Sequence, residues 1–295
     1  MVVIFVATRF GGDPAINMLP ATATPHQIQD MRHQLGEDRS YPEQFGIFMK
    51  GMATFDYGRS AVSQEAVTKL LSTTVPNTLK LALATFIVVL ITSMPLGVLA
   101  ATHRGQLTDK LVRLLAAGGQ AAPPFWIGLV LIEVFAVRFR WLPVSGNGNG
   151  GLGAWPYYLM PAFTWGLLLF AALVRLLRSA MLENLDADFV TLARAKGVPA
   201  WKIIWVHVFR NAALPILTFI AIWTGTAVTG SVVVEQVFNW PGIGALFINS
   251  VLARDLPVVE AVAELVAIGV LAANLAADLL YGVIDPRVRI ATGAA

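Results

Sequence analysis

The chain has 295 residues, of which 56% are apolar and only 13% are charged, and it contains no cysteine. This charge fraction is about half that of a soluble globular domain, which indicates an integral membrane protein. The absence of cysteine excludes disulfides, thiolate metal ligands and a cysteine nucleophile, and the net charge of +3, spread over many short loops, gives no basis for nucleic-acid binding.

The N-terminal residues are apolar, but the apolar run is short. Residues 1–7 are followed at once by Arg9 and a Gly-Gly-Asp-Pro turn, whereas a helix that crosses a bilayer needs about 20 residues. No basic region precedes the run and no cleavage pattern follows it, so a secretory signal peptide also fits poorly. We interpret residues 1–10 as a partial first transmembrane helix and expect the remainder of that helix upstream of Met1.

The segment of residues 11–78 contains helix signals of its own. Thr24-Pro25 is a helix-start signal that apolar residues follow at helical spacing, and a second such set follows Pro42. We predict short amphipathic helices that cover the outer mouth of a membrane domain.

Five later stretches are long and apolar enough to be transmembrane helices. Three carry no charge, namely residues 81–101, 155–174 and 212–234. Two are interrupted by polar residues: residues 114–137 by Glu133, and residues 261–284 by Glu264, Asn274 and Asp278. Such groups can face a bundle interior or a water-filled cavity, so both stretches are also predicted to span the membrane. Prolines predict kinks at Pro95 and at Pro123-Pro124.

The distribution of basic residues predicts the orientation. Lysine and arginine are more than twice as dense in residues 102–113, 175–210 and 285–295 as in residues 11–78, 138–156 and 237–257. Since basic residues are retained preferentially in the cytoplasm, we place the first set and the C-terminus there. Alternation of sides then requires a span before residue 11. The predicted fold is an all-α integral membrane protein with about six transmembrane helices, the first apparently truncated.

The loop from Asp186 to Pro215 is predicted to form two short helices. Asp186 or Asp188 can cap the first, Gly197 suits the left-handed residue that closes it, and Pro199 suits the first turn of the second. The second helix has an apolar face made of Trp201, Ile204, Trp205 and Val208. This pattern alone fits equally well an ordinary amphipathic helix that rests on the membrane surface.

The same loop resembles a known motif. Its three runs are Asp188-Phe189-Val190, Ala193-Arg194-Ala195-Lys196-Gly197 and Arg210-Asn211-Ala212-Ala213-Leu214-Pro215. They resemble the EAA-type loop of ABC importer permeases of the dipeptide/oligopeptide family, which also handles nickel chelates and glutathione. The general pattern has Glu where this chain has Thr191 and a small residue where it has Leu192, so the resemblance applies to the loop and not to every side chain.

Further matches occur in the family's order along nearly the whole chain. They include Gly12-Asp13-Pro14, Ala23-Thr24-Pro25, Asp56-Tyr57-Gly58-Arg59-Ser60, Pro123 to Gly128, Trp141-Leu142-Pro143, Glu235 to Phe238, Pro241 to Gly244, Arg254 to Pro257, Asn274 to Tyr281 and Asp285-Pro286-Arg287. The resemblance implies an extracytoplasmic segment at residues 11–78, a transmembrane permease domain at 79–285 with a coupling loop at 181–211, and a cytoplasmic tail at 286–295.

The resemblance also implies the function and the partners. The chain would form, with a second similar permease, the pathway by which an ATP-driven importer carries peptides or similar small solutes. Two cytoplasmic ATPase subunits, an extracytoplasmic substrate-binding protein and membrane lipid complete the expected surroundings. The residues expected to couple to the ATPases are Asp188, Phe189, Ala193, Arg194, Ala195, Lys196 and Gly197.

Several polar residues admit more than one interpretation. Glu235, with Gly230 and Ser231, is a candidate for lining the pathway, although packing alone explains a single glycine equally well. Glu133 and Asp278 lie near span ends, where snorkelling or pairing explains them without contact to substrate. Arg175 and Arg178 are interpreted as anchors at the cytoplasmic membrane surface.

No catalytic or metal site is expected in the chain. It has no phosphate-binding Gly-rich loop, so ATP and magnesium are expected in partner subunits. The four histidines are dispersed; only His26 and His33 could share a helix face, and they are more simply exposed side chains. A secondary transporter would show inverted repeats, and an intramembrane hydrolase would show paired catalytic groups; the sequence shows neither. The identity of the substrate does not follow from the sequence.

Overall fold

A computed structural model of the chain describes residues 22–35, 38–148, 152–213, 215–217, 219–220 and 232–284, together with residues 5, 6, 15, 16, 19 and 223. The regular structure in these parts of the chain is helical. The prediction of an all-α integral membrane protein is therefore confirmed.

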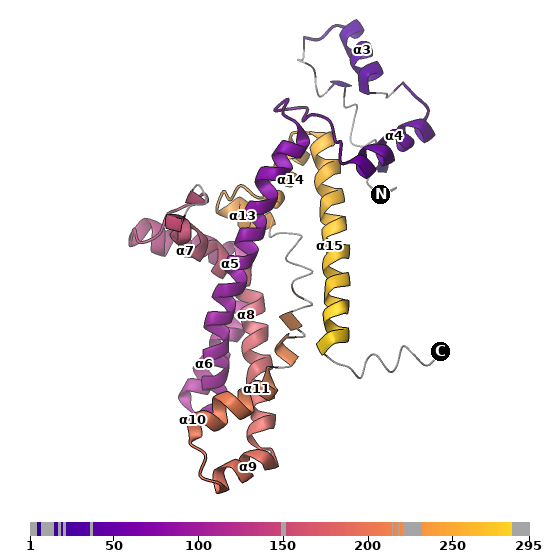
Figure 1. Cartoon of the computed structure of the whole chain (residues 1–295). Coiled ribbons are helices and arrows are strands. Elements are labelled where there is room, and N and C mark those ends of the chain that lie inside the picture. Colours follow the sequence, from indigo (N-terminus) through magenta and orange to yellow (C-terminus); the bar gives the residue numbers. More distant parts are fainter. Residues whose placement is uncertain are drawn as a thin grey trace, which may run out of the picture.

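Two long helices form the centre of the molecule. α5 (Val67–Thr102) and α8 (Trp155–Leu185) lie side by side over much of their length (Figure 1). Their facing sides supply most of the main core, including Val89, Val98, Leu169, Leu173, Leu177 and Met181. The helices approach closely where residues are small, because a Cβ atom at Gly166 would lie 2.3 Å from Val89 Cγ2. Small residues at the contact let two membrane helices pack backbone to backbone.

Three described helices are long and apolar enough to cross a membrane: α5, α8 and α15 (Leu256–Ile284). They contain the predicted spans at residues 81–101, 155–174 and 261–284. The predicted span at residues 212–234 lies largely outside the described residues.

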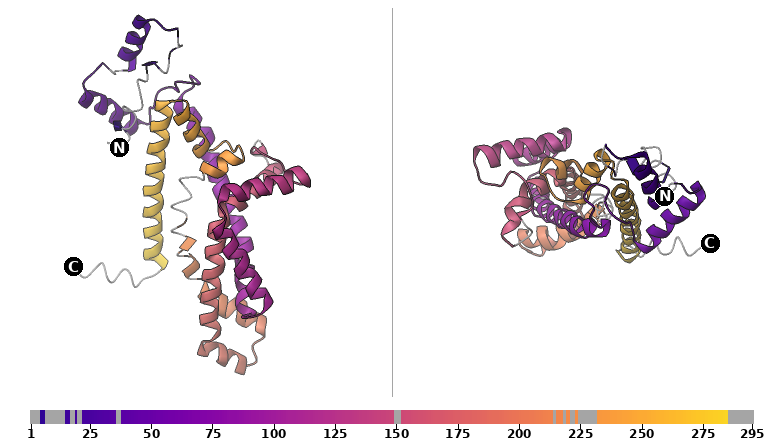
Figure 2. Two further views of the ribbon diagram at one scale, coloured as in Figure 1. Left: turned by 180° about the vertical axis from the view of Figure 1, so that it is seen from behind. Right: turned by 90° about the horizontal axis from the view of Figure 1, so that it is seen from above.

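The span predicted at residues 114–137, with a kink at Pro123-Pro124, is sharply bent. α6 (Leu107–Ala121) is followed, at a bend of 110°, by α7 (Pro124–Leu131) and a π-helix, η1 (Ile132–Arg138). Figure 2 shows α7 projecting sideways from the long helices. The cause is the Pro123-Pro124 pair, because a proline lacks an N–H donor and forces the residue before it into extended backbone; Pro123 has φ −60° and ψ 135°. Pro95, in contrast, lies inside α5, which stays helical.

The short helices predicted within residues 11–78 are present. α3 (Pro25–Leu35) begins where Thr24 N–H donates to the Gln27 side chain at 2.8 Å, and α4 (Tyr41–Thr54) begins with a bond of 3.2 Å from Ser40 N–H to Glu43. Of the predicted partial helix at residues 1–10, the structure describes only Phe5 and Val6, and Phe5 packs on Phe45 and Phe48 of α4. α5 begins at Val67, which lies before residue 79, the predicted start of the transmembrane permease domain.

The two ends of the molecule carry different elements. α3 and α4 lie at one end, near α14 (Ile243–Leu252) and the start of α15 (Figure 1). The opposite end carries α9 (Asp188–Ala195) and α10 (Ala200–Lys202). α15 stands beside the main bundle, packs on α5 and α14 through Val258, Ala261 and Val262, and runs toward the end that carries α9.

Candidate coupling site

α9 begins without a side-chain cap. Its N-cap is Ala187 in extended backbone (φ −76°, ψ 150°), and no side chain bonds to the free N–H groups there. Asp186 instead follows the end of α8 and lies 3.5 Å from Arg104, and Asp188 is the first residue of α9. The predicted cap is therefore wrong, but Asp188 in the first turn does complement the positive end of the helix dipole.

As predicted, Gly197 is the left-handed residue that closes α9, with φ +73°. The Val198 N–H donates to Ala193 O at 3.1 Å and the Gly197 N–H donates to Arg194 O at 3.0 Å. This pair of bonds is the Schellman motif, which satisfies the last carbonyls of a helix and needs a left-handed residue that glycine adopts without strain. The turn after α9 is thus fixed by backbone chemistry.

The second loop helix buries only part of its predicted apolar face. It comprises α10, the π-helix η4 (Ile203–Val208) and α11 (Phe209–Ala212), and Pro199 precedes its first turn. Ile203 and Val208 are buried, five residues apart, while Trp201 and Trp205 are 64% and 47% exposed. A π-helix bonds residue i to i+5, so a face predicted from the 3.6-residue period rotates away across this turn.

The predicted coupling residues lie together on α9 and its closing turn. Ala193 is half-buried, and the exposed members are Asp188, Phe189, Arg194, Ala195, Lys196 and Gly197. Val190 is fully buried in the same core as Ile203 and Leu177, so α9 is packed onto the long helices by one side and exposes the other. The loop is consequently a rigid extension of the α5–α8 pair and not a free tether.

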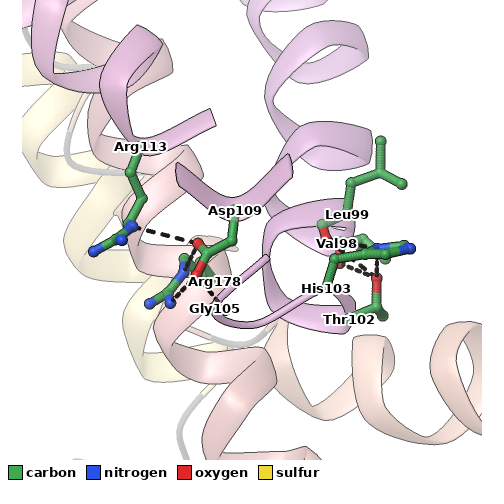
Figure 3. Close-up of polar contacts among 8 residues, drawn as sticks. All are labelled: Val98, Leu99, Thr102, His103, Gly105, Asp109, Arg113 and Arg178. Carbon is green, nitrogen blue, oxygen red and sulfur yellow. Dashed lines mark hydrogen bonds and ion pairs between the residues drawn. The ribbon is translucent and has the colours of Figure 1, made fainter. Parts of the chain in front are cut away.

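An ion pair that the sequence analysis missed lies next to this loop (Figure 3). Arg178 Nε lies 2.7 Å from Asp109 Oδ1 and its Nη2 lies 2.9 Å from Oδ2, so the pair is bidentate and joins α8 to α6. Asp109 is 1% exposed and also accepts the Gly105 N–H at 2.9 Å. Arg113 lies 3.4 Å from the same carboxylate. Bidentate pairs of this kind fix orientation as well as distance.

The two arginines interpreted as membrane anchors therefore have specific partners. Arg178 binds Asp109, and Arg175 donates to the Gln120 side chain. Asp109 and Arg113 are four residues apart, which was the one available signal that Asp109 pairs with arginine, although residues 102–113 were interpreted as a loop. The partner on α8 is 69 residues away in sequence, and spacing carries no information about it.

Of the three candidates for lining the pathway, Gly230 and Ser231 lie outside the described residues. Glu235, in α13 (Val232–Val237), is fully buried. It accepts the Thr78 hydroxyl at 2.7 Å and the Ala245 N–H at 2.9 Å, and Thr78 in turn accepts the Ile243 N–H at 2.8 Å. Glu235 thus joins α5, α13 and the start of α14, and its role in a pathway stays a prediction.

The other candidate polar residues are separated from one another. His26 lies 2.8 Å from Asp30 and His33 lies 2.6 Å from Asp38. Glu133 is exposed on η1, Glu264 is buried on α15, and the side chain of Asp278 lies outside the described residues. Within the described part of the chain these groups do not form a metal-binding cluster.

Known proteins resemble both the transmembrane region and the whole chain. Residues 93–290 match the family model described as "Binding-protein-dependent transport system inner membrane component". The chain is 34% identical over 278 residues to proteins named "Glutathione transport system permease protein GsiC" from Escherichia coli strain K12 and from Shigella dysenteriae serotype 1. Each alignment covers 94% of this chain and 89% of the relative.

Proposed function

Because the chain belongs to the family of binding-protein-dependent transport system inner membrane components, and is thus a transmembrane permease subunit of an ATP-driven importer, we propose that α9 is its contact with the ATPase. The observation that carries this proposal is the construction of the loop: α9 is exposed on one side and packed by Val190 into the core of the spans on the other. A push on its exposed side is then passed to α5 and α8, because packed cores have low compressibility.

The proposed complex contains this chain, a second similar permease, two ATPase subunits with bound ATP and magnesium, and an extracytoplasmic binding protein. ATP-driven closure of the ATPases displaces the loop around Ala193 to Gly197 and turns the pathway from inward-facing to outward-facing. This chain has no catalytic step of its own in the scheme. Its substrate is a peptide or a similar small solute, and glutathione is one candidate because the relatives are named for its transport.

The proposed orientation has α9 and the C-terminus in the cytoplasm and α3 and α4 outside. The density of basic residues supports it, since residues 102–113 and 175–210 belong to the same end of the molecule. The direction of α15, from the end with α3 and α4 toward the end with α9, supports a cytoplasmic C-terminus. In this arrangement Glu235 lies near the outer end of the pathway.

Site-directed cross-linking tests the proposal, and the absence of native cysteine makes it direct. Ala195→Cys on α9, carrying a photoreactive maleimide, is expected to form an adduct with an ATPase subunit in membranes that contain the whole transporter. Ser63→Cys, exposed in the segment before α5, is the matched control and is expected to form none. An adduct from Ser63→Cys, or none from Ala195→Cys in an assembled complex, would contradict the docking surface.

A further inference from the structure

A pocket of about 510 Å³ lies where the long helices meet the coupling loop. The ends of α5 and α8, the closing turn of α9 and the start of the second loop helix all line it. Most of its wall is apolar, contributed by Ala101, Leu182, Leu185, Val198, Ile203 and Ile204. The charged lining consists of Arg104, Arg194 and Asp186.

The charged side chains that line the pocket favour an anionic ligand. Arg104 and Asp186 lie 3.5 Å apart, but their side chains are 65% and 76% exposed, and an exposed ion pair of this kind contributes little to stability. Arg194 has no ion-pair partner among the residues that the structure describes. Two guanidinium groups therefore line the pocket against one carboxylate, and guanidinium is the side-chain group best matched to phosphate oxygens.

Along α5, the pocket lies at the boundary between hydrocarbon and head groups. Ala101 is the last residue of the uncharged run 81–101, and Arg104 is the first charged residue after it. On the second loop helix, Trp201 and Trp205 are exposed, and exposed tryptophan is enriched at that boundary. A ligand here meets apolar side chains on one side and arginines on the other.

We propose that the pocket binds an anionic phospholipid of the cytoplasmic leaflet. Its phosphate binds Arg104 and Arg194, and the first carbons of its acyl chains lie against Leu182, Val198 and Ile203. The assignment to the cytoplasmic leaflet rests on the orientation given under the proposed function. Basic pockets between membrane helices recognise such head groups.

The proposal has a consequence for coupling. Arg194 belongs to α9, whereas Arg104 follows α5, so a phosphate bound by both joins the exposed coupling surface to the end of a span. Anionic lipid then acts as a structural element of the loop, and the importer depends on the composition of its membrane.

Lipid binding by the purified full chain tests this directly. Phosphatidylglycerol is titrated into the chain in detergent, with phosphatidylcholine as the neutral reference, and bound lipid is counted by native mass spectrometry. Arg104→Gln and Arg194→Gln are each expected to weaken phosphatidylglycerol binding roughly fivefold, the usual effect of one basic residue near an anionic surface. Asp186→Asn is expected to strengthen it, because it removes the one negative charge in the lining.

Lys202→Gln is the matched control, since Lys202 is an exposed basic residue of the same loop that does not line the pocket. If it weakened binding as much as Arg194→Gln did, general surface charge and not the pocket would be responsible. Equal binding of phosphatidylcholine, or displacement of the lipid by inorganic phosphate alone, would also overturn the proposal. The measurement uses no ATPase, so failure of the docking surface would leave its result intact.

Discussion

At each end of this permease, polar contacts hold the helices together, but the kind of contact differs between the two ends. At the end that carries α9, the buried carboxylate of Asp109 is held mainly by the guanidinium of Arg178, with Arg113 nearby and one backbone N–H, that of Gly105. At the opposite end, Glu235 and Asp255 are buried, and neither has a basic partner in the ion pairs of the described residues. They bind hydroxyl groups and backbone N–H groups of other segments: Thr78 and Ala245 for Glu235, and Ser60 and Ala61 for Asp255.

This difference determines which polar contacts can be replaced by apolar side chains. Two side chains that balance each other can be replaced together by apolar residues of similar size. A carboxylate that satisfies backbone N–H groups cannot be replaced in this way, because the N–H groups remain when the side chain is removed. The Asp109–Arg178 pair should therefore tolerate paired substitution apart from the cost of the Gly105 N–H, whereas Glu235 and its partners should not tolerate it.

The largest effect is expected at the ion pair. Arg178→Met leaves the Asp109 carboxylate buried without its main partner and should lower the free energy of unfolding by about 3 kcal/mol. Asp109→Leu combined with Arg178→Met should recover part of that loss, and the Gly105 N–H, which then lacks its acceptor, accounts for the remainder. Unfolding of the purified chain in mixed micelles measures each variant. If the double variant lost as much free energy of unfolding as the two single variants together, the expected recovery at this end would be contradicted.

A smaller effect, without recovery, is expected at Glu235. Glu235→Leu leaves the Thr78 hydroxyl and the Ala245 N–H unsatisfied and should cost about 2 kcal/mol. Adding Thr78→Val should not restore stability, because the N–H groups of Ala245 and Ile243 then both lack an acceptor. Glu65→Leu, in the exposed pair with Lys69, is the control and should change the free energy by less than about 1 kcal/mol. If Glu235→Leu combined with Thr78→Val regained free energy of unfolding, the two ends would not differ in their response to paired substitution.

The smallest effect concerns the backbone at the coupling end. Gly197→Ala should cost about 1 kcal/mol because Gly197 has φ +73°, although a Cβ atom there meets no other atom within 4 Å. Gly118→Ala, in α6 and equally open, should instead stabilise its helix by a similar amount. Uptake and ATPase stimulation should fall together for Gly197→Ala. Equal stability of the two variants would mean that the closing turn of α9 is not fixed by its glycine.

The sequence predicted those parts of the fold that depend on local rules. The uncharged runs predicted α5 and α8, Thr24-Pro25 predicted the start of α3, and the position of Gly197 predicted the end of α9. Each of these signals comes from residues within one turn or one span. The Pro123-Pro124 pair likewise predicted a kink, but the sequence carried no information on the size of the bend.

The parts that were missed depend on partners or on irregular helix. The pairing of Asp109 with Arg178 joins two helices, and the burial of Glu235 depends on Thr78, 157 residues away. The apolar face predicted for the second loop helix is only partly buried, because η4 has a different period from an α-helix. Of the candidate site, sequence motifs therefore indicated where α9 lies, whereas its attachment to the core through Val190 required the structure.

The length of α5 has one more consequence. The helix has 36 residues and is therefore about 54 Å long, whereas the hydrocarbon is about 30 Å thick. Head groups account for only about 5–8 Å on each side. α5 is thus longer than the whole bilayer, and its surplus extends into water, where a soluble protein can contact it without touching the lipid.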